Sequence, residues 1–282
     1  MLRLSALSLF AVLSLTALTG CSKSATDTLP PASGRSAGAS ALRPTSMPNG
    51  FWNHARPGIA GVLFVHASPD APNVDINLGW LPAARDLAFG RNTPYRFTFA
   101  GARRITVNVA GTKTTVIDAT PTLAPRTFYS VFAIDKVANI GPLVLVDDLT
   151  LPAAGKAHVR FVHLSPDAPA VDVAVANGGP VVFGNKSFKD ATAFTPLPAG
   201  TYDLEVRLAG TSTVVLPLPG IKLAAGSIYT VYAKGLVAGT GAQALGAGII
   251  VNNAFDRNDN NNDDDAAKQA NNDAAVSVGS QN

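Results

Sequence analysis

The middle of the chain alternates apolar with polar positions at a period of two. Leu204, Val206 and Leu208 alternate with charged residues, and the segments 105–109 and 171–175 show similar alternation. Such a pattern is typical of β-strands that bury one face. Turn signals such as Pro-Asp and Ala-Gly recur about every 8–12 residues, as expected for a β-sandwich. The pattern therefore predicts short strands joined by many turns.

These strands fall into a tandem repeat. The segment FVHASPDAPNVDI begins at Phe64 and FVHLSPDAPAVDV begins at Phe161, which is an offset of 97 residues. Two further pairs of similar segments keep the same order with offsets of 99 and 100 residues. A unit of about 95 residues is longer than the 20–50-residue period of solenoids. We therefore predict two duplicated domains, repeat one at 58–152 and repeat two at 153–252.

One segment in each repeat favours a particular kind of sandwich. The segment LAAGSIYTVYA, which contains Gly226 and Tyr229, resembles the tyrosine corner of immunoglobulin-like and fibronectin-like domains. There the tyrosine hydroxyl bonds the backbone a few residues upstream. Repeat one keeps Tyr129 but has Arg126 in place of the glycine, and an ordinary strand after a tight turn has similar spacing. We predict an all-β fold of two tandem immunoglobulin-like/fibronectin-like β-sandwich domains.

Composition agrees with this fold class. The acidic residues are 18 Asp and one Glu, and the chain has 25 Gly and 20 Pro. Asp favours caps and turns, so a mostly helical protein is unexpected, and a coiled coil lacks its Glu/Lys heptads. The formal net charge is +3, but no segment concentrates enough positive charge to follow a phosphate backbone. Nucleic acid is therefore excluded as an expected partner.

The N-terminus has the layout of an export signal. A basic start at Arg3 precedes an apolar run over residues 4–18, which is too short to span a membrane. The segment Leu-Thr-Gly-Cys that ends at Cys21 resembles the lipobox of bacterial lipoproteins. That resemblance implies a lipoprotein signal peptide at 1–20 and diacylation of Cys21. An ordinary signal peptide with a cysteine at its cleavage site is the alternative.

The lipobox resemblance also implies a cellular location and a partner. Residues 21–57 would form the lipid anchor and a flexible tether, and the membrane would be a partner through the lipid on Cys21. Cys21 is the only cysteine, so no intramolecular disulfide is possible. Ser22 stands where an Asp would resemble an inner-membrane retention signal, which favours the outer membrane or cell surface. Residues 253–282 are expected to form a disordered Asn/Asp-rich tail.

The duplicated motif and the lipobox together suggest a family. The pattern FVHxSPDAPxVDV, present twice, resembles the domain of unknown function 4397 family of bacterial surface proteins. The resemblance extends over nearly all of 58–252. It implies an all-β extracellular module without an assigned activity, and it provides no catalytic residues to carry over.

The same motif contains the candidate site residues. Each copy has one His, one Ser and two Asp, namely His66, Ser68, Asp70, Asp75, His163, Ser165, Asp167 and Asp172. They could bind a divalent metal, because imidazole and carboxylate groups are suitable ligands. Alternatively, Ser-Pro-Asp-Ala forms a type I turn in which the Asp bonds its own backbone and the His ties a strand end to the corner. We favour the structural interpretation, since both copies need the same corner to fold.

Enzyme motifs give no support for catalysis. The His, Ser and Asp of one copy are too close along the chain to face one another as a triad, and no H-E-x-x-H is present. An EF-hand loop beginning at Asp256 would have Asn261 and Ala267 at its glycine and glutamate positions. We expect a non-enzymatic envelope lipoprotein, a surface binding or structural module with no cofactor and no metal, whose partner is an unknown envelope polymer or protein. The alternative is a metal-dependent or hydrolytic surface enzyme that uses the His-x-Ser-Pro-Asp motif.

Overall fold

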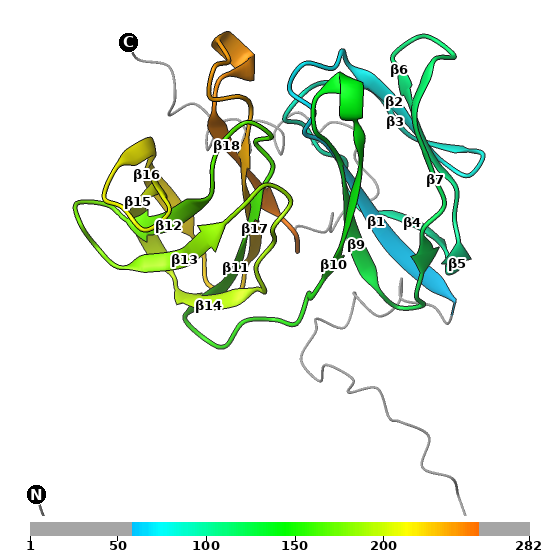
Figure 1. Ribbon diagram of the computed structural model, residues 1–282. Coiled ribbons are helices and arrows are strands. Elements are labelled where there is room, and N and C mark those ends of the chain that lie inside the picture. The colour runs from blue at the N-terminus through cyan, green and yellow to red at the C-terminus, as the bar shows by residue number, and fades with distance from the viewer. Residues whose placement is uncertain (1–57, 254–282) are drawn as a thin grey trace, which may run out of the picture. The chain divides into compact units, whose positions relative to one another are not determined.

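The computed structural model of the chain describes residues 58–253 (Figure 1). The predicted signal peptide, Cys21, the predicted tether up to residue 57 and the predicted tail beyond residue 253 lie outside the described residues.

The first repeat forms two four-stranded sheets and a two-stranded ribbon. In spatial order the first sheet contains β10 (Gly141–Asp147), β9 (Phe128–Ile134), β1 (Ile59–His66) and β4 (Arg96–Phe99). The second sheet contains β3 (Leu81–Leu87), β2 (Val74–Leu78), β6 (Ile105–Val109) and β7 (Thr115–Ala119). The ribbon pairs β5 (Gly101–Ala102) with β8 (Thr122–Leu123).

The second repeat has the same order of strands. Its first sheet contains β14 (Thr195–Pro198), β11 (Lys156–His163), β17 (Ile228–Lys234) and β18 (Gly246–Val251). Its second sheet contains β13 (Val181–Lys186), β12 (Val171–Val175), β15 (Gly200–Leu208) and β16 (Val214–Leu223). Short 3₁₀ helices at Val137–Asn139 and Gly241–Gln243 precede the last strand of each repeat. Within residues 58–253 no helix has the length and apolar character needed to cross a membrane.

The predicted all-β sandwich class is confirmed, and the order of its strands adds a detail that the sequence did not reveal. In each repeat the first strand pairs in parallel with the seventh long strand, β1 with β9 and β11 with β17. The first and second strands lie in different sheets, whereas they are neighbours in an immunoglobulin constant domain. The parallel pair has a consequence for the motif, because parallel strands end at the same edge of a sheet.

Each repeat has a core between its two sheets. In repeat one, Val62 and Phe64 of β1 pack with Ile76 of β2 and Val107 of β6. The corresponding strands of repeat two form a second cluster around Phe161. The alternating apolar positions found in the sequence therefore supply the inner faces of both sandwiches.

The outer faces of four strands are buried as well. Leu63 and Phe132, from β1 and β9, share a third hydrophobic cluster with Val162 and Tyr232, from β11 and β17. The rings of Phe132 and Tyr232 meet edge to face at 6.0 Å between centroids. Because both faces of these strands are covered, the two repeats share buried apolar surface.

A buried ion pair lies beside this shared cluster. The Arg160 guanidinium, on β11, donates to Asp147 on β10 at 2.5 Å, and both side chains are almost fully buried. Arg160 also donates to the hydroxyl of Ser130 at 3.1 Å and to that of Thr230 at 2.8 Å. The planar guanidinium thus bonds groups from both repeats at once.

The second oxygen of Asp147 completes the network. It accepts from the hydroxyl of Tyr95 at 2.5 Å and from the hydroxyl of Ser130 at 2.8 Å. Burial, and then the nearby charge of Asp147, raise the pKa of Tyr95, so its phenol stays a donor. Asn252 joins the network through Thr230 and Tyr95. The charges are therefore paired and also hydrogen-bonded, as burial requires.

We expect Arg160→Met to lower the free energy of unfolding by about 3–5 kcal/mol, because Asp147 would remain buried without a countercharge. Urea denaturation of the full chain measures the change. The matched control is Arg104→Met, which removes an ion pair with Asp118 whose side chains are 63% and 46% exposed and should change stability little. Equal losses in the two variants would contradict the assignment.

Candidate functional site

The duplicated motif forms a corner directly after β1. His66 is the last residue of β1 and is fully buried. Its Nε2 lies 3.0 Å from the carbonyl oxygen of Pro72, and the backbone N–H of Ser68 donates to its Nδ1 at 3.4 Å. A carbonyl can only accept, so Nε2 carries the proton and donates. The imidazole therefore holds the Ser-Pro-Asp-Ala-Pro loop to the end of the strand.

The second copy has the same arrangement. His163, at the end of β11, places Nε2 3.2 Å from the carbonyl oxygen of Pro169. Burial lowers the pKa of both His66 and His163, and the bond to the carbonyl opposes this only in part. Both imidazoles are therefore neutral at pH 7, with their single proton used in a structural bond.

The first Asp of each copy reaches out of its turn. Asp70 accepts from the backbone N–H of Val137 at 2.8 Å, and Asp167 accepts from that of Val237 at 2.9 Å. We predicted that this carboxylate would bond the backbone of its own turn. In the structure it instead bonds the backbone of a distant loop, the one after β9 or the one after β17. The reason is the parallel pairing of β1 with β9 and of β11 with β17, which brings the loops after both strands to one edge.

The second Asp of each copy bonds an edge strand on one side and a hairpin turn on the other. The two oxygens of Asp75 accept from the backbone N–H groups of Asp86 at 2.9 Å and Gly111 at 3.1 Å. These two bonds lower the pKa of Asp75. Asp86 has a φ of 50°, so the carboxylate also holds a residue in the sparsely populated left-handed region.

Asp172 is the counterpart of Asp75 in the second repeat. Its oxygens accept from Asn185 at 2.6 Å and from Gly210 at 2.8 Å. Asn185 has a φ of 51°, as Asp86 has in the first repeat. Both copies thus use one carboxylate to fix a kink in the neighbouring edge strand and the hairpin turn on the other side.

The serines do not form a nucleophile pair with the histidines. Ser68 and Ser165 are fully buried, and the hydroxyl of Ser165 lies 3.4 Å from Asp167. The Ser68 hydroxyl has no hydrogen-bond partner among residues 58–253, and His66 receives the Ser68 backbone N–H instead. A serine nucleophile needs a base that accepts its hydroxyl proton. Within residues 58–253 neither imidazole accepts from a serine hydroxyl, and the Ser165 hydroxyl donates to its neighbour Asp167 instead.

The part of the chain that the structure describes also contains no group of three or more His, Cys, Asp or Glu residues that could hold a metal ion. Each carboxylate of the motif faces backbone N–H groups instead. Within the described residues, the side chains of each motif copy thus form hydrogen bonds that join neighbouring backbone segments. They do not converge as a set of metal ligands.

The tyrosine corner is present in both repeats. The Tyr129 hydroxyl accepts from the backbone N–H of Ala124 at 2.8 Å, and Tyr229 accepts from Ala224 at 3.0 Å. Arg126 takes the conformation of its glycine counterpart, with a φ of 57° against 78° for Gly226. The predicted bond is therefore confirmed despite the departure at Arg126.

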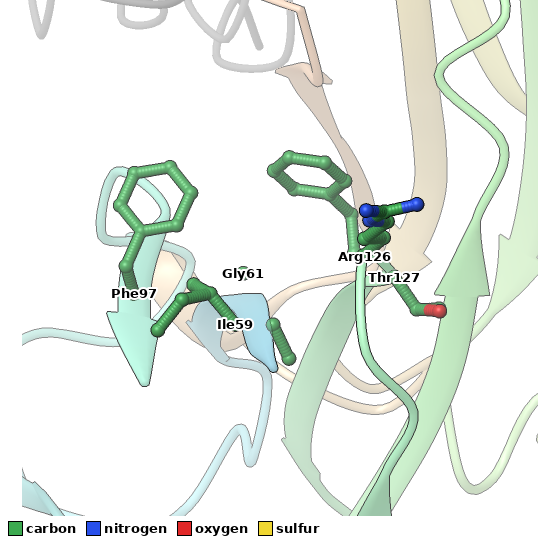
Figure 2. Close-up of a pocket in the computed structure, with 7 residues that line it drawn as sticks. Ile59, Gly61, Phe97, Arg126 and Thr127 are labelled. Carbon is green, nitrogen blue, oxygen red and sulfur yellow. The ribbon is translucent and has the colours of Figure 1, made fainter. Parts of the chain in front are cut away.

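A shallow hollow lies beside this corner in repeat one. Figure 2 shows Ile59, Gly61, Phe97, Arg126 and Thr127 around it. Its free volume is about 0 Å³, so the hollow has no room for a ligand.

A comparison with family models now bears on the resemblance. Residues 60–174 match the model described as "Domain of unknown function (DUF4397)". The predicted resemblance is confirmed. The matched segment runs from β1 of repeat one into β12 of repeat two. The model's description names no activity, so the match supports the resemblance and indicates no reaction.

Two further comparisons add little. No curated protein matches the chain. Among solved structures, a leucine-rich repeat protein from Bacteroides thetaiotaomicron matches at 10% identity, with a TM-score of 0.16. That match covers 61% of this chain and 25% of the other, so this chain spans about a quarter of that protein. A likeness this weak carries no argument.

Sequence reasoning missed the polar network between the repeats. Arg160 precedes the second copy of the motif, and Asp147 ends β10. The signal in the sequence was a charged residue at position 160 of a strand segment, and a surface position would produce the same signal.

We expect Asp172→Ala to lower the free energy of unfolding by about 1–3 kcal/mol, because two backbone donors lose their acceptor. Asp75→Ala is the matched control and should cost less, since Asp75 is more exposed and its bonds are longer. Thermal melts with chelator, calcium or zinc measure both. A metal-dependent stabilisation of the wild type that both variants lose would overturn the structural role.

The two buried histidines predict a pH dependence. Their folded-state pKa values lie below the ordinary value of about 6.5, so the unfolded chain binds more protons below that pH. Stability should therefore be full above about pH 6.5 and fall as the pH drops toward 5. Chemical denaturation at several pH values measures this slope. The double variant His66→Gln/His163→Gln should flatten it, and an unchanged slope would contradict the assignment.

Proposed function

We propose that the chain is a non-enzymatic cell-envelope lipoprotein whose two β-sandwich repeats act as a surface binding or structural module. The observation that carries this proposal is the use of the duplicated motif in both copies. His66 and His163 donate to carbonyls, and the four carboxylates of the motif accept from backbone N–H groups. These bonds give both histidines and all four carboxylates a structural use within the fold, which supports a structural role of the motif.

A solvent-facing tryptophan supports contact with a partner. Trp80, in the tight turn between β2 and β3, is 88% exposed, and its neighbour Leu81 is 46% exposed. The corresponding turn of repeat two is Asn-Gly-Gly-Pro and carries no aromatic side chain. Tryptophan is enriched where proteins meet partners. We propose that this turn belongs to the surface that contacts an envelope polymer or protein.

The anchor is proposed from the sequence. The lipobox would place a lipid on Cys21, and two or more acyl chains give stable membrane anchoring. The low overall charge and the lack of a basic patch give no reason to propose nucleic acid as a partner.

We expect Cys21→Ala to move the protein from the detergent phase to the aqueous phase after detergent-phase partitioning, because the variant would lack its acyl chains. The conservative control is Ser22→Ala, which leaves the acceptor in place and should partition like the wild type. A Cys21→Ala protein that stays in the detergent phase would show that the anchor is not a lipid at this position.

Elemental analysis distinguishes the proposed binding or structural module from the metal-dependent enzyme. The purified chain, dialysed without chelator, should contain no stoichiometric zinc, calcium or manganese by elemental analysis. Bound metal that disappears in both Asp70→Ala and Asp167→Ala would instead establish the metal-dependent alternative.

A further inference from the structure

The interior of repeat two contains a cavity. Its volume is about 140 Å³, and residues from both sheets of the sandwich formed by β11–β18 line it. Val159 and Phe161 line it from one sheet, and Val173, Val175 and Leu204 line it from the other. A well-packed core leaves few voids larger than a water molecule, so a space of this size is unusual.

The lining of the cavity is apolar. Its walls are aliphatic and aromatic side chains, and the one hydroxyl among them, that of Tyr202, donates to the carbonyl oxygen of Pro198 at 2.8 Å. A buried water needs two to four polar partners, and apolar cavities of about 150 Å³ stay dry and take up benzene or xenon. The chemistry of this space therefore favours a hydrocarbon over water.

The two repeats differ in side-chain size around the cavity, and in both directions, because Phe183 lines it where repeat one has Ala84. Ile76 and Val107 are paired in repeat one, and Val173 and Val206 are paired at the same place in repeat two. One step further along the strand, Leu78 is replaced by Val175. Two adjacent inward positions of β12 thus carry smaller side chains than their counterparts in β2.

One end of the cavity approaches the surface. Val173 and Phe161 are buried, whereas Val175 and Tyr202 are half-buried and Pro198 is exposed. Pro198 and Tyr202 lie where β14 passes into β15, and Val175 ends β12, beside the edge strand β13. A ligand can therefore enter by displacement of side chains at one end of the sandwich, without separation of the sheets.

We infer that repeat two binds a small hydrocarbon group, of about the size of a benzene ring, between its sheets next to Val173 and Val175. The site is independent of the proposed lipid anchor, and it does not use the His, Ser or Asp side chains of the duplicated motif. It gives the second repeat a binding capacity that rests on size and apolarity alone.

Benzene and phenol are the probes. Titration of the full chain with benzene, followed by the methyl signals of Val173, Val175 and Leu204 in NMR spectra, should give saturable shifts and a higher Tm. Phenol has nearly the same shape, but its hydroxyl would be buried without a partner, so it should bind at least about tenfold more weakly. Equal binding of both probes, or benzene shifts that do not saturate, would overturn the inference.

Cavity-filling variants give the second arm. Val175→Leu introduces the residue that repeat one has at this position, and it should weaken benzene binding by at least about tenfold while the Tm without benzene rises or stays equal. Val173→Ile tests the same point if Val175→Leu does not fold. The matched control is Val214→Leu on β16, whose side chain is 44% exposed outside the cavity and should leave binding unchanged. Benzene binding that survives in both filling variants would show that benzene binds elsewhere.

Discussion

The buried pair of Arg160 and Asp147 constrains the two repeats more than any other contact. A charge that leaves water must find a countercharge and fill its remaining hydrogen bonds, or it destabilises the fold by several kcal/mol. Arg160 meets this demand with oxygens from both repeats, since Ser130 and Asp147 lie in one and Thr230 in the other. Any arrangement that separates these groups leaves a charge buried alone. The pair thus selects one packing of the repeats, although the surrounding cluster of Leu63, Phe132 and Tyr232 supplies the apolar area.

This packing of the two repeats determines which side chains the central strands need on each face. β1 and β9, and equally β11 and β17, need apolar side chains on both faces, because one face fills a sandwich and the other meets the opposite repeat. The sequences of β1, β9 and β17 accordingly run as mostly apolar segments, whereas β11 contains Lys156, His158 and Arg160 and β6 and β15 alternate. A continuous run is typical of strands with both faces covered. The parallel pairing of these same strands then brings the loops that follow them to one edge, where Asp70 and Asp167 join them.

The sequence predicted what local pattern and internal duplication can reveal. The alternating strands, the repeat and the bond of Tyr129 and Tyr229 to upstream backbone depend on residues close in the chain. The partners of Asp70 and Asp75 did not follow from the sequence, because Val137 and Gly111 approach them only through strand order. The cavity was hidden for a different reason. Valine in place of isoleucine or leucine preserves the apolar pattern, so a loss of volume leaves no trace in periodicity.

The differences between the two copies indicate where each repeat has its own role. The histidine, serine and both aspartates of the motif are identical, and the aspartates and histidines bind equivalent backbone groups in both copies. A framework under that constraint cannot diverge without loss of stability. The changes lie elsewhere: Leu63 corresponds to Arg160, and Asp147 corresponds to Asn252, since each lies at the same place in the strand pairing. One copy supplies the cation and the other the anion, so the outer face of repeat one cannot pair equally well with a second copy of itself. Duplication thus gave two equivalent scaffolds, and complementary substitutions at their contact made the pairing of unlike repeats the favoured one.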